Sequence, residues 1–184
     1  MKAVLISIQP KWCELIASGK KTIEVRKTRP KMETPFKVYV YMTKHKWIFK
    51  LLPFLKNRFA KVIGEFVCDD IIVDERGENA DVFSKYAQLS LVEQKKYGAN
   101  KPLFGWHITD LKIYDKPKEL GEFRKPCIDK YQYCQSCKYG LVTLSPDEEE
   151  YAMYHGGYYD TFDTVCTNRV TRPPQSWCYV EELE

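Results

Sequence analysis

Long hydrophobic runs are missing from this 184-residue sequence. Its apolar runs are short and interrupted by lysines, and none approaches the roughly 20 residues that a helix needs to cross a bilayer. The N-terminal run from Ala3 to Ile8 is brief and has no small-residue cleavage site after it, which argues against a secretory signal peptide. The sequence also lacks internal repeats and low-complexity segments. These absences predict a cytoplasmic protein without a membrane span.

The composition is that of a globular protein, with 44% hydrophobic and 14% aromatic residues. A chain of this length can form one domain and bury about two-thirds of its unfolded surface. Charge is distributed unevenly along it. Residues 1–66 hold fifteen Lys and Arg against four Asp and Glu, a net charge of +11, and the remainder carries −7. The basic part either attracts a polyanion such as nucleic acid or forms a solvated surface that faces the acidic part.

Hydrophobic periodicity predicts several strands and two or three short helices, an arrangement typical of a small mixed β-barrel of the α+β class. A third helix, over 44–59 and interrupted at Pro53, has a basic and an apolar face, so we expect it to complete the core, to lie along RNA or to rest on a membrane surface. Residues 115–175 show no regular pattern. The other expected elements are strands at 3–8, 22–26, 36–42, 61–73, 102–114 and 176–180, and helices at 11–18 and 81–97. We expect the strand at 176–180 to pair with an N-terminal strand.

Short motifs follow one another in a fixed order: Ser7-Ile8-Gln9-Pro10-Lys11-Trp12, the G-x-K-x-x-E-x-R pattern from Gly19 to Arg26, Gly64-Glu65-Phe66, Gly105-Trp106-His107-Ile108 and the ending from Pro173 to Val180. They resemble those of ASCH-domain proteins, which belong to the PUA-like superfamily. The resemblance covers residues 1–114 and 173–182, and its C-terminal part is similar to phage and prophage members. It implies one domain over 1–184, built as a small PUA-like mixed β-barrel with short flanking helices, with 115–172 as a cysteine- and tyrosine-rich insertion.

Four charged residues of these motifs, Lys21, Glu24, Arg26 and Glu65, lie on or beside expected strands. Glu24 and Arg26 are two residues apart and therefore share one strand face. If that face lines a cleft, the charges must pair or meet a polar ligand, because isolated buried charges are costly. We expect all four charged groups to converge in such a cleft, with Glu65 coming from a different strand. The alternative is a solvated sheet face with ordinary ion pairs. The resemblance implies a site that binds RNA or a modified nucleoside, with the ligand-binding residues Lys21, Glu24, Arg26, Trp12 and Ser7. The candidate rings for stacking a base are Trp12, Trp106, Trp177, Tyr39 and Tyr41, with core packing as the alternative and Trp12 as the preferred ring.

Some ASCH proteins are amidohydrolases that act on N4-acetylcytidine with a lysine, a threonine and a glutamate. By position, the resemblance gives Lys21 and Glu65 as catalytic residues here, while Glu24 occupies the threonine position. A carboxylate at this place holds the neighbouring ammonium charged instead of serving as a hydroxyl nucleophile. The sequence therefore leaves open whether the chain is an RNA- or nucleoside-binding protein, a small amidohydrolase acting on an acylated pyrimidine nucleoside, or a phage-type accessory protein without catalysis.

Cysteine is abundant, with seven residues. Cys134 and Cys137 form one C-x-x-C pair, which is half of a tetrahedral zinc site, and no second C-x-x-C is present. We expect a structural zinc held by Cys127, Cys134, Cys137 and Cys178, with His155 and Cys166 as alternative ligands. Free buried cysteines are the competing interpretation.

Overall fold

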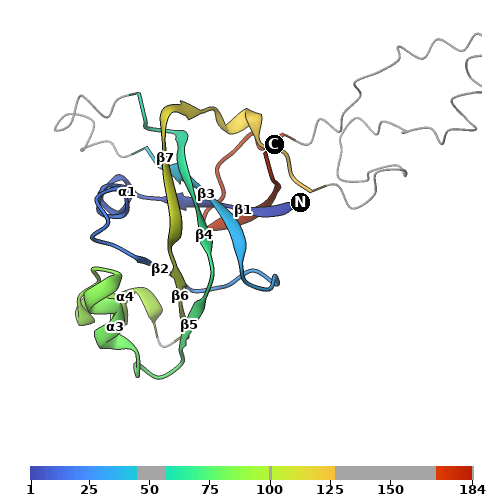
Figure 1. The fold of residues 1–184 in the computed structure, drawn as a ribbon. Coiled ribbons are helices and arrows are strands. Elements are labelled where there is room, and N and C mark those ends of the chain that lie inside the picture. The colour runs from blue at the N-terminus through green and yellow to red at the C-terminus, as the bar shows by residue number, and fades with distance from the viewer. Residues whose placement is uncertain (45–56, 100, 127–168, 184) are drawn as a thin grey trace, which may run out of the picture.

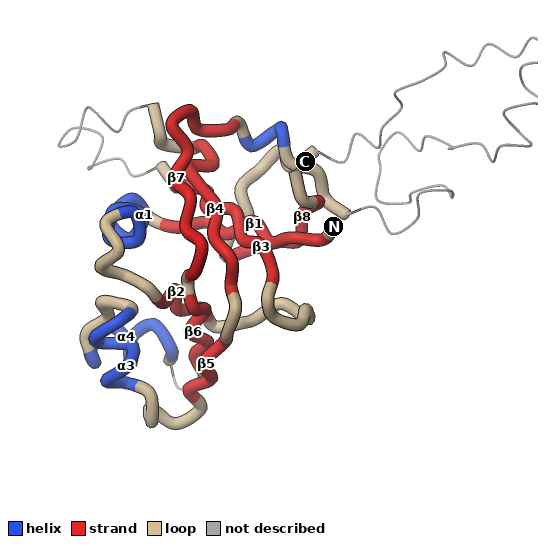
Figure 2. Tube along the Cα trace, in the orientation of Figure 1, coloured by secondary structure: helices blue, strands red, loops and turns tan. Residues whose placement is uncertain are grey.

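The computed structural model describes residues 1–44, 57–99, 101–126 and 169–183 (Figure 1). Its strands form two sheets (Figure 2). The five-stranded sheet has the order β7 (Thr109–Lys118), β4 (Lys61–Cys68), β3 (Phe36–Met42), β1 (Lys2–Ile8), β8 (Trp177–Glu181). The three-stranded sheet has the order β2 (Ile23–Arg26), β6 (Leu103–His107), β5 (Ile71–Asp74). The helices are α1 (Pro10–Ala17), α3 (Ala80–Tyr86), α4 (Leu91–Gly98) and the 3-10 helix η2 (Leu120–Glu122).

The two ends of the chain meet in the five-stranded sheet. β1 runs parallel to β3, with Ile6 opposite Val40, and antiparallel to β8, with Ile6 opposite Trp177. The expected pairing of the C-terminal strand with an N-terminal strand is therefore confirmed, and the termini lie side by side (Figure 1). The α+β class is confirmed as well. Among the described strands no hydrogen-bonded ladder joins the two sheets, so the closed barrel stays a prediction.

Alternation along the strands divides the core. Val4, Ile6 and Ile8 of β1 pack on one face of the five-stranded sheet, and Ala3 and Leu5 pack on the other. A third cluster lies between β2 and the pair of helices α3 and α4, which stand at one end of the molecule (Figure 2). In the described part of the chain, no helix is long and apolar enough to cross a membrane.

Three elements that were expected to be continuous are each broken in two. The helix at 81–97 is α3 and α4, because Gln88 has a φ of +57° and Ser90 begins a new helix with a capping box to Glu93. The strand at 61–73 is β4 and β5, and the strand at 102–114 is β6 and β7; each of these pairs divides between the two sheets. The break between α3 and α4 lies at a single residue, Gln88, that a hydrophobic pattern does not reveal.

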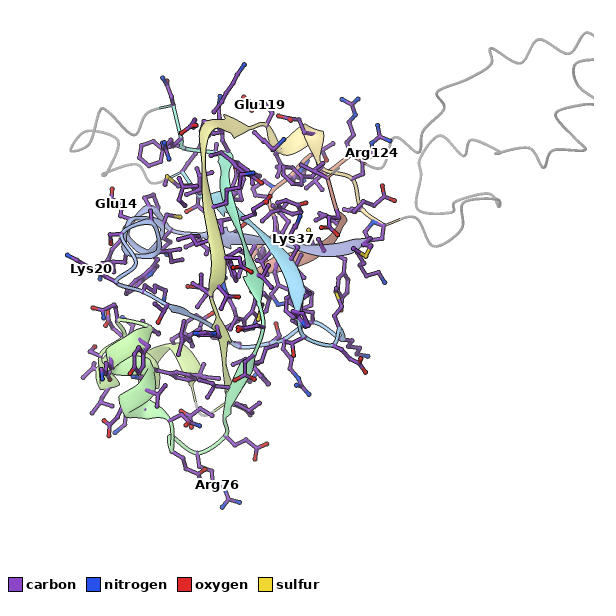
Figure 3. The ribbon with its side chains drawn as sticks, in the orientation of Figure 1. Glu14, Lys20, Lys37, Arg76, Glu119 and Arg124 are labelled. Atoms are coloured by element: carbon purple, nitrogen blue, oxygen red, sulfur yellow. The ribbon has the colours of Figure 1, made fainter. Side chains whose placement is uncertain are left out.

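The segment expected to be irregular, 115–175, begins and ends as part of the core. β7 continues to Lys118, and both Phe123 and Val170 are buried. The Val170 N–H donates to the carbonyl of Phe123 at 2.8 Å, and Arg124 lies beside the C-terminal strand, where its carbonyl accepts from Glu181 (Figure 3). Phe123 and Val170, near the two ends of this segment, are therefore held next to each other in the core. Residues 127–168 and most of the expected basic helix at 44–59 lie outside the described residues.

Candidate functional site

The candidate site is built on β2, which follows helix α1 and its terminal glycine. Pro10 occupies the first turn of α1, and Gly19 takes a φ of +72°, a conformation that L side chains rarely adopt. On β2, Ile23 and Val25 pack into the third core cluster. Their alternation turns Glu24 toward the opposite side, as the sequence predicted.

Three charged side chains, hereafter the floor triad, converge beside β2: Lys21, Glu24 and Arg26. Lys21 Nζ lies 3.3 Å from Glu24 Oε2, and Arg26 Nη2 lies 3.0 Å from Glu24 Oε1. All three are buried, with 2%, 5% and 7% of their surfaces exposed. The Glu24 carboxylate therefore lies between two cationic groups, one at each of its oxygens.

Lys21 is committed to partners within the protein. Its ammonium donates a hydrogen bond of 2.7 Å to the carbonyl of Ala87, the residue that ends α3, and it lies 5.1 Å from the centre of the Trp12 ring. Burial lowers the pKa of Lys21, and the Glu24 carboxylate partly opposes this effect. The lysine therefore links the end of α3 to the floor triad.

Arg26 is held by a hydrogen bond to Ser7, near the end of β1. Its Nη2 donates to the carbonyl of Ser7 at 2.6 Å. The Ser7 hydroxyl in turn donates to the carbonyl of Pro174 at 2.7 Å, and the Ser7 N–H to that of Ser176 at 2.9 Å. The C-terminal segment before β8 is thus tied to the floor through Ser7, whose hydroxyl is already used as a donor.

A cleft with a volume of about 1020 Å³ opens above the floor triad. Besides the triad, its charged lining consists of Lys27, Lys44 and Lys96, hereafter the rim lysines, and Glu93; all four are exposed. Five basic and two acidic side chains therefore line the cleft. Trp12 and Tyr97, both partly buried, contribute aromatic surface, and the segment from Pro173 to Ser176 forms another part of the lining.

Glu65 does not join the floor triad, so the expected convergence of four charges is correct for three of them and wrong for this one. It lies on β4, opposite Tyr39 on β3, and its carboxylate accepts a hydrogen bond from the hydroxyl of Tyr114. It is absent from the residues that line the cleft. Burial is the main reason that the pKa of Tyr114 is raised, and the Glu65 carboxylate adds to it. The register of β4 and β7 fixes this partner, and sequence spacing does not specify such a register.

The other candidate aromatic residues differ in position. Trp106 is fully buried in the first core cluster and packs edge-on against Phe36, so it is a core residue. Trp177 is partly exposed, and its indole N–H donates to Thr28 at 3.0 Å. Trp12 alone of these tryptophans lines the cleft, which is where the sequence placed it.

The expected zinc ligands Cys127, Cys134 and Cys137 lie outside the described residues, as do the alternatives His155 and Cys166. Cys178 is described, and it packs on β8 against the second core cluster. No group of three or more potential metal ligands occurs among the residues that the structure describes. The zinc site stays a prediction.

Sequence reasoning missed the contribution of α4. Glu93, Lys96 and Tyr97 lie three and four residues apart on this helix and so face the cleft together. The S-x-x-E pattern at Ser90 was a signal for a helix start that would have placed them on one short helix. That α4 packs beside β2 is a tertiary relationship without a local signal.

Comparisons with known proteins agree with this fold. The sequence profile of the ASCH domain matches residues 6–118. The crystal structure of ASCH from Zymomonas mobilis is similar, with a TM-score of 0.53 and 16% identity over 98% of this chain and 88% of that one. A serine-to-alanine mutant of the same Zymomonas mobilis protein gives a TM-score of 0.53 and 16% identity, covering 98% and 89%. Likeness at this identity shows the fold alone. No curated protein matches the chain.

Proposed function

This chain belongs to the ASCH domain family, and we propose on that premise that it binds RNA or a nucleoside in the cleft above the floor triad. The observation that carries the proposal is a buried ion-pair cluster, with Lys21 and Arg26 on either side of Glu24, beneath a basic rim. Surface ion pairs are common, but three charged groups that are more than nine-tenths buried at the base of a cleft need a reason. A polar ligand that forms hydrogen bonds at the base of the cleft supplies one.

The rim supports a phosphate-bearing ligand. The three rim lysines are exposed, and Glu93 is the one acidic residue of the cleft lining beside them, so the rim carries a net positive charge. Exposed lysines attract phosphate through counterion release, whatever the base sequence. Trp12 and Tyr97 supply aromatic surface on which a base can stack, a contact worth about 1–3 kcal/mol.

The experiment compares two adjacent lysines of α4. Lys95 and Lys96 are both exposed, but only Lys96 lines the cleft. We expect Lys96→Ala to weaken binding of a fluorescent single-stranded RNA several-fold and to reduce the salt slope of log Kd by about 1. Lys95→Ala, the matched control, should leave affinity within about twofold of wild type. Lys95 does not line the cleft, and salt screens the attraction between an exposed lysine and a phosphate that it does not contact.

Two outcomes would contradict the proposal. Equal loss in both variants would mean that a diffuse basic surface attracts the RNA and that the cleft plays no part. A wild-type chain that binds neither RNA nor nucleosides would remove the proposal and favour the third expectation, a phage-type accessory protein that binds another protein.

Hydrolysis of an acylated pyrimidine nucleoside such as N4-acetylcytidine is the second candidate. One observation favours it: burial lowers the pKa of Lys21, which brings this amine closer to a neutral, proton-accepting state. The position of Glu65, hydrogen-bonded to Tyr114 and outside the cleft lining, counts against the catalytic pair that the resemblance implied.

Chromatographic detection of cytidine and acetate released from N4-acetylcytidine tests this candidate. We expect the Lys21→Met variant to lose turnover and the Glu65→Gln variant to retain it, because Lys21 lines the cleft and Glu65 does not. Loss of turnover in both variants would support a Lys21 and Glu65 pair and contradict the geometric assignment.

A further inference from the structure

We propose that Glu24 makes the cleft accept a nucleotide base-first, with an amino group of the base against the Glu24 carboxylate and the phosphate at the rim lysines. This inference rests on the proposed function and names the ligand's orientation and the kind of base. It makes Glu24 the specificity-determining residue of the cleft.

The first step is that Glu24 offers acceptors only. An ionised carboxylate has two oxygens with about four lone-pair sites and no donor. Each oxygen has one cationic partner in the floor triad, Lys21 at Oε2 and Arg26 at Oε1. Lone pairs therefore remain on both oxygens for a ligand that brings N–H donors.

The second step is that the floor rejects phosphate although it contains two cations. The ammonium of Lys21 donates to the Ala87 carbonyl as well as facing Glu24, and Nη2 of Arg26 donates to the Ser7 carbonyl as well as facing Glu24. These two donor groups already serve internal acceptors, and Arg26 Nε, which has no hydrogen-bond partner, is buried away from solvent. A phosphate at the floor would compete for them while facing the Glu24 carboxylate at close range, where like charges repel.

The third step is that the exposed rim has the opposite character. Lys27 and Lys96 carry solvated ammonium groups at the cleft, and Lys27 lies 4.9 Å from the centre of the Tyr97 ring. A phosphate placed there meets cations without losing much hydration. An acidic floor group beneath a basic rim thus orients a nucleotide with its phosphate outward and its base inward.

The base that suits this floor carries an exocyclic amino group. Cytosine presents an amino donor beside a ring acceptor, and guanine presents an amino donor beside a ring N–H. Uracil presents two carbonyl oxygens on either side of its N3–H, and both would face the carboxylate unfavourably. Hypoxanthine lacks the 2-amino group of guanine. The structure therefore predicts that the amino-bearing member of each pair binds more tightly.

The test titrates the protein with two matched pairs of mononucleotides, CMP against UMP and GMP against IMP, and follows binding by NMR. We expect the amino-bearing member to bind about tenfold more tightly in each pair, within the discrimination of a good base contact. In Glu24→Gln the preference should shrink to about twofold, because an amide can donate to a carbonyl oxygen as well as accept. Glu14→Gln, at an exposed glutamate of α1 that does not line the cleft, is the control and should keep the wild-type ratio.

Orientation is tested by removing the phosphate. Lys96→Ala should weaken CMP binding and leave cytidine binding unchanged, whereas equal weakening of both would overturn the base-first orientation. Measurable binding with equal affinities inside both wild-type pairs would overturn the role of Glu24 and leave the proposed function standing; this arm needs no variant to fold. If the wild type binds neither mononucleotides nor RNA, the proposed function itself fails.

Discussion

The hydroxyl of Ser7 donates a 2.7 Å hydrogen bond to the carbonyl of Pro174, across 167 residues of sequence. Ser7 also accepts from Arg26 through its own carbonyl, so one residue joins the floor triad to the C-terminal part of the cleft lining. The segment from Pro173 to Ser176 is thereby fixed to the site through contacts with the end of β1.

The first prediction concerns this connection. Ser7→Ala leaves the Pro174 carbonyl without its partner, and we expect a loss of about 1–3 kcal/mol in the free energy of unfolding, measured with urea. Ser18→Ala is the control, because the Ser18 hydroxyl makes an exposed hydrogen bond to the Leu15 carbonyl, 3.2 Å long, away from the cleft. The control should lie within about 0.5 kcal/mol of wild type. Equal losses of unfolding free energy in the two variants would show that the hydrogen bond from Ser7 to Pro174 stabilises the fold no more than an exposed one.

The second prediction concerns the close packing of β6. A Cβ atom at Gly105 would lie 2.5 Å from the Phe83 ring and 2.9 Å from the Ile23 side chain. We expect Gly105→Ala to destabilise the protein by about 1–3 kcal/mol, because α3 must move away from the three-stranded sheet to make room for the added methyl group. At Gly121 an added Cβ meets nothing within 4 Å, so Gly121→Ala should change thermal stability little. A stable Gly105→Ala variant would contradict the tight contact.

The third prediction is a pH dependence. Burial raises the pKa of the Cys68 thiol from 9.0 to about 12. Above pH 9 the unfolded chain releases this proton while the folded chain keeps it, so the contribution of Cys68 to the free energy of unfolding falls as pH rises, by about 1.4 kcal/mol per pH unit. Between about pH 9 and 10 the free energy of unfolding, measured with urea, should therefore fall by about 1 kcal/mol less in Cys68→Ala than in wild type, because the unfolded thiol is only half ionised at pH 9. Identical slopes would contradict it.

The fourth prediction is the zinc site expected from the sequence. Protein purified without chelator should contain about one zinc per chain, with loss of the metal in Cys134→Ser. The control is Cys13→Ser, because Cys13 is buried in the first core cluster and should not affect the metal content. Metal-free wild-type protein would leave the free-cysteine interpretation.

Sequence patterns predicted those parts of the fold that depend on local alternation. The strand at 36–42 has the expected bounds, and the opposite faces of β2 follow directly from a period of two. They failed where one residue ends an element, as Gln88 does between α3 and α4. They failed as well for Glu65, because a partner such as Tyr114 is set by the register between distant strands. Three of the four charged residues thus come from one local stretch of the sequence, and the position of the fourth depends on tertiary structure.

The last prediction concerns the charge balance of the floor triad. Glu24→Gln removes the carboxylate between Lys21 and Arg26, and we expect a loss of about 3–5 kcal/mol near neutral pH because two buried cations then lack a counter-charge. The exposed Glu14 on α1 provides the control variant Glu14→Gln, which should be close to wild type (Figure 3).

Glu24 opposes the effect of burial on the pKa of Lys21, so the Glu24→Gln substitution lowers the pKa of Lys21 further. In the variant the folded state then gives up this proton at a lower pH than the unfolded state does, so its free energy of unfolding rises with pH relative to wild type. Denaturation curves at about pH 7 and 9 should show the difference narrowing. A difference that stays constant or widens would mean that Lys21 does not carry the uncompensated charge.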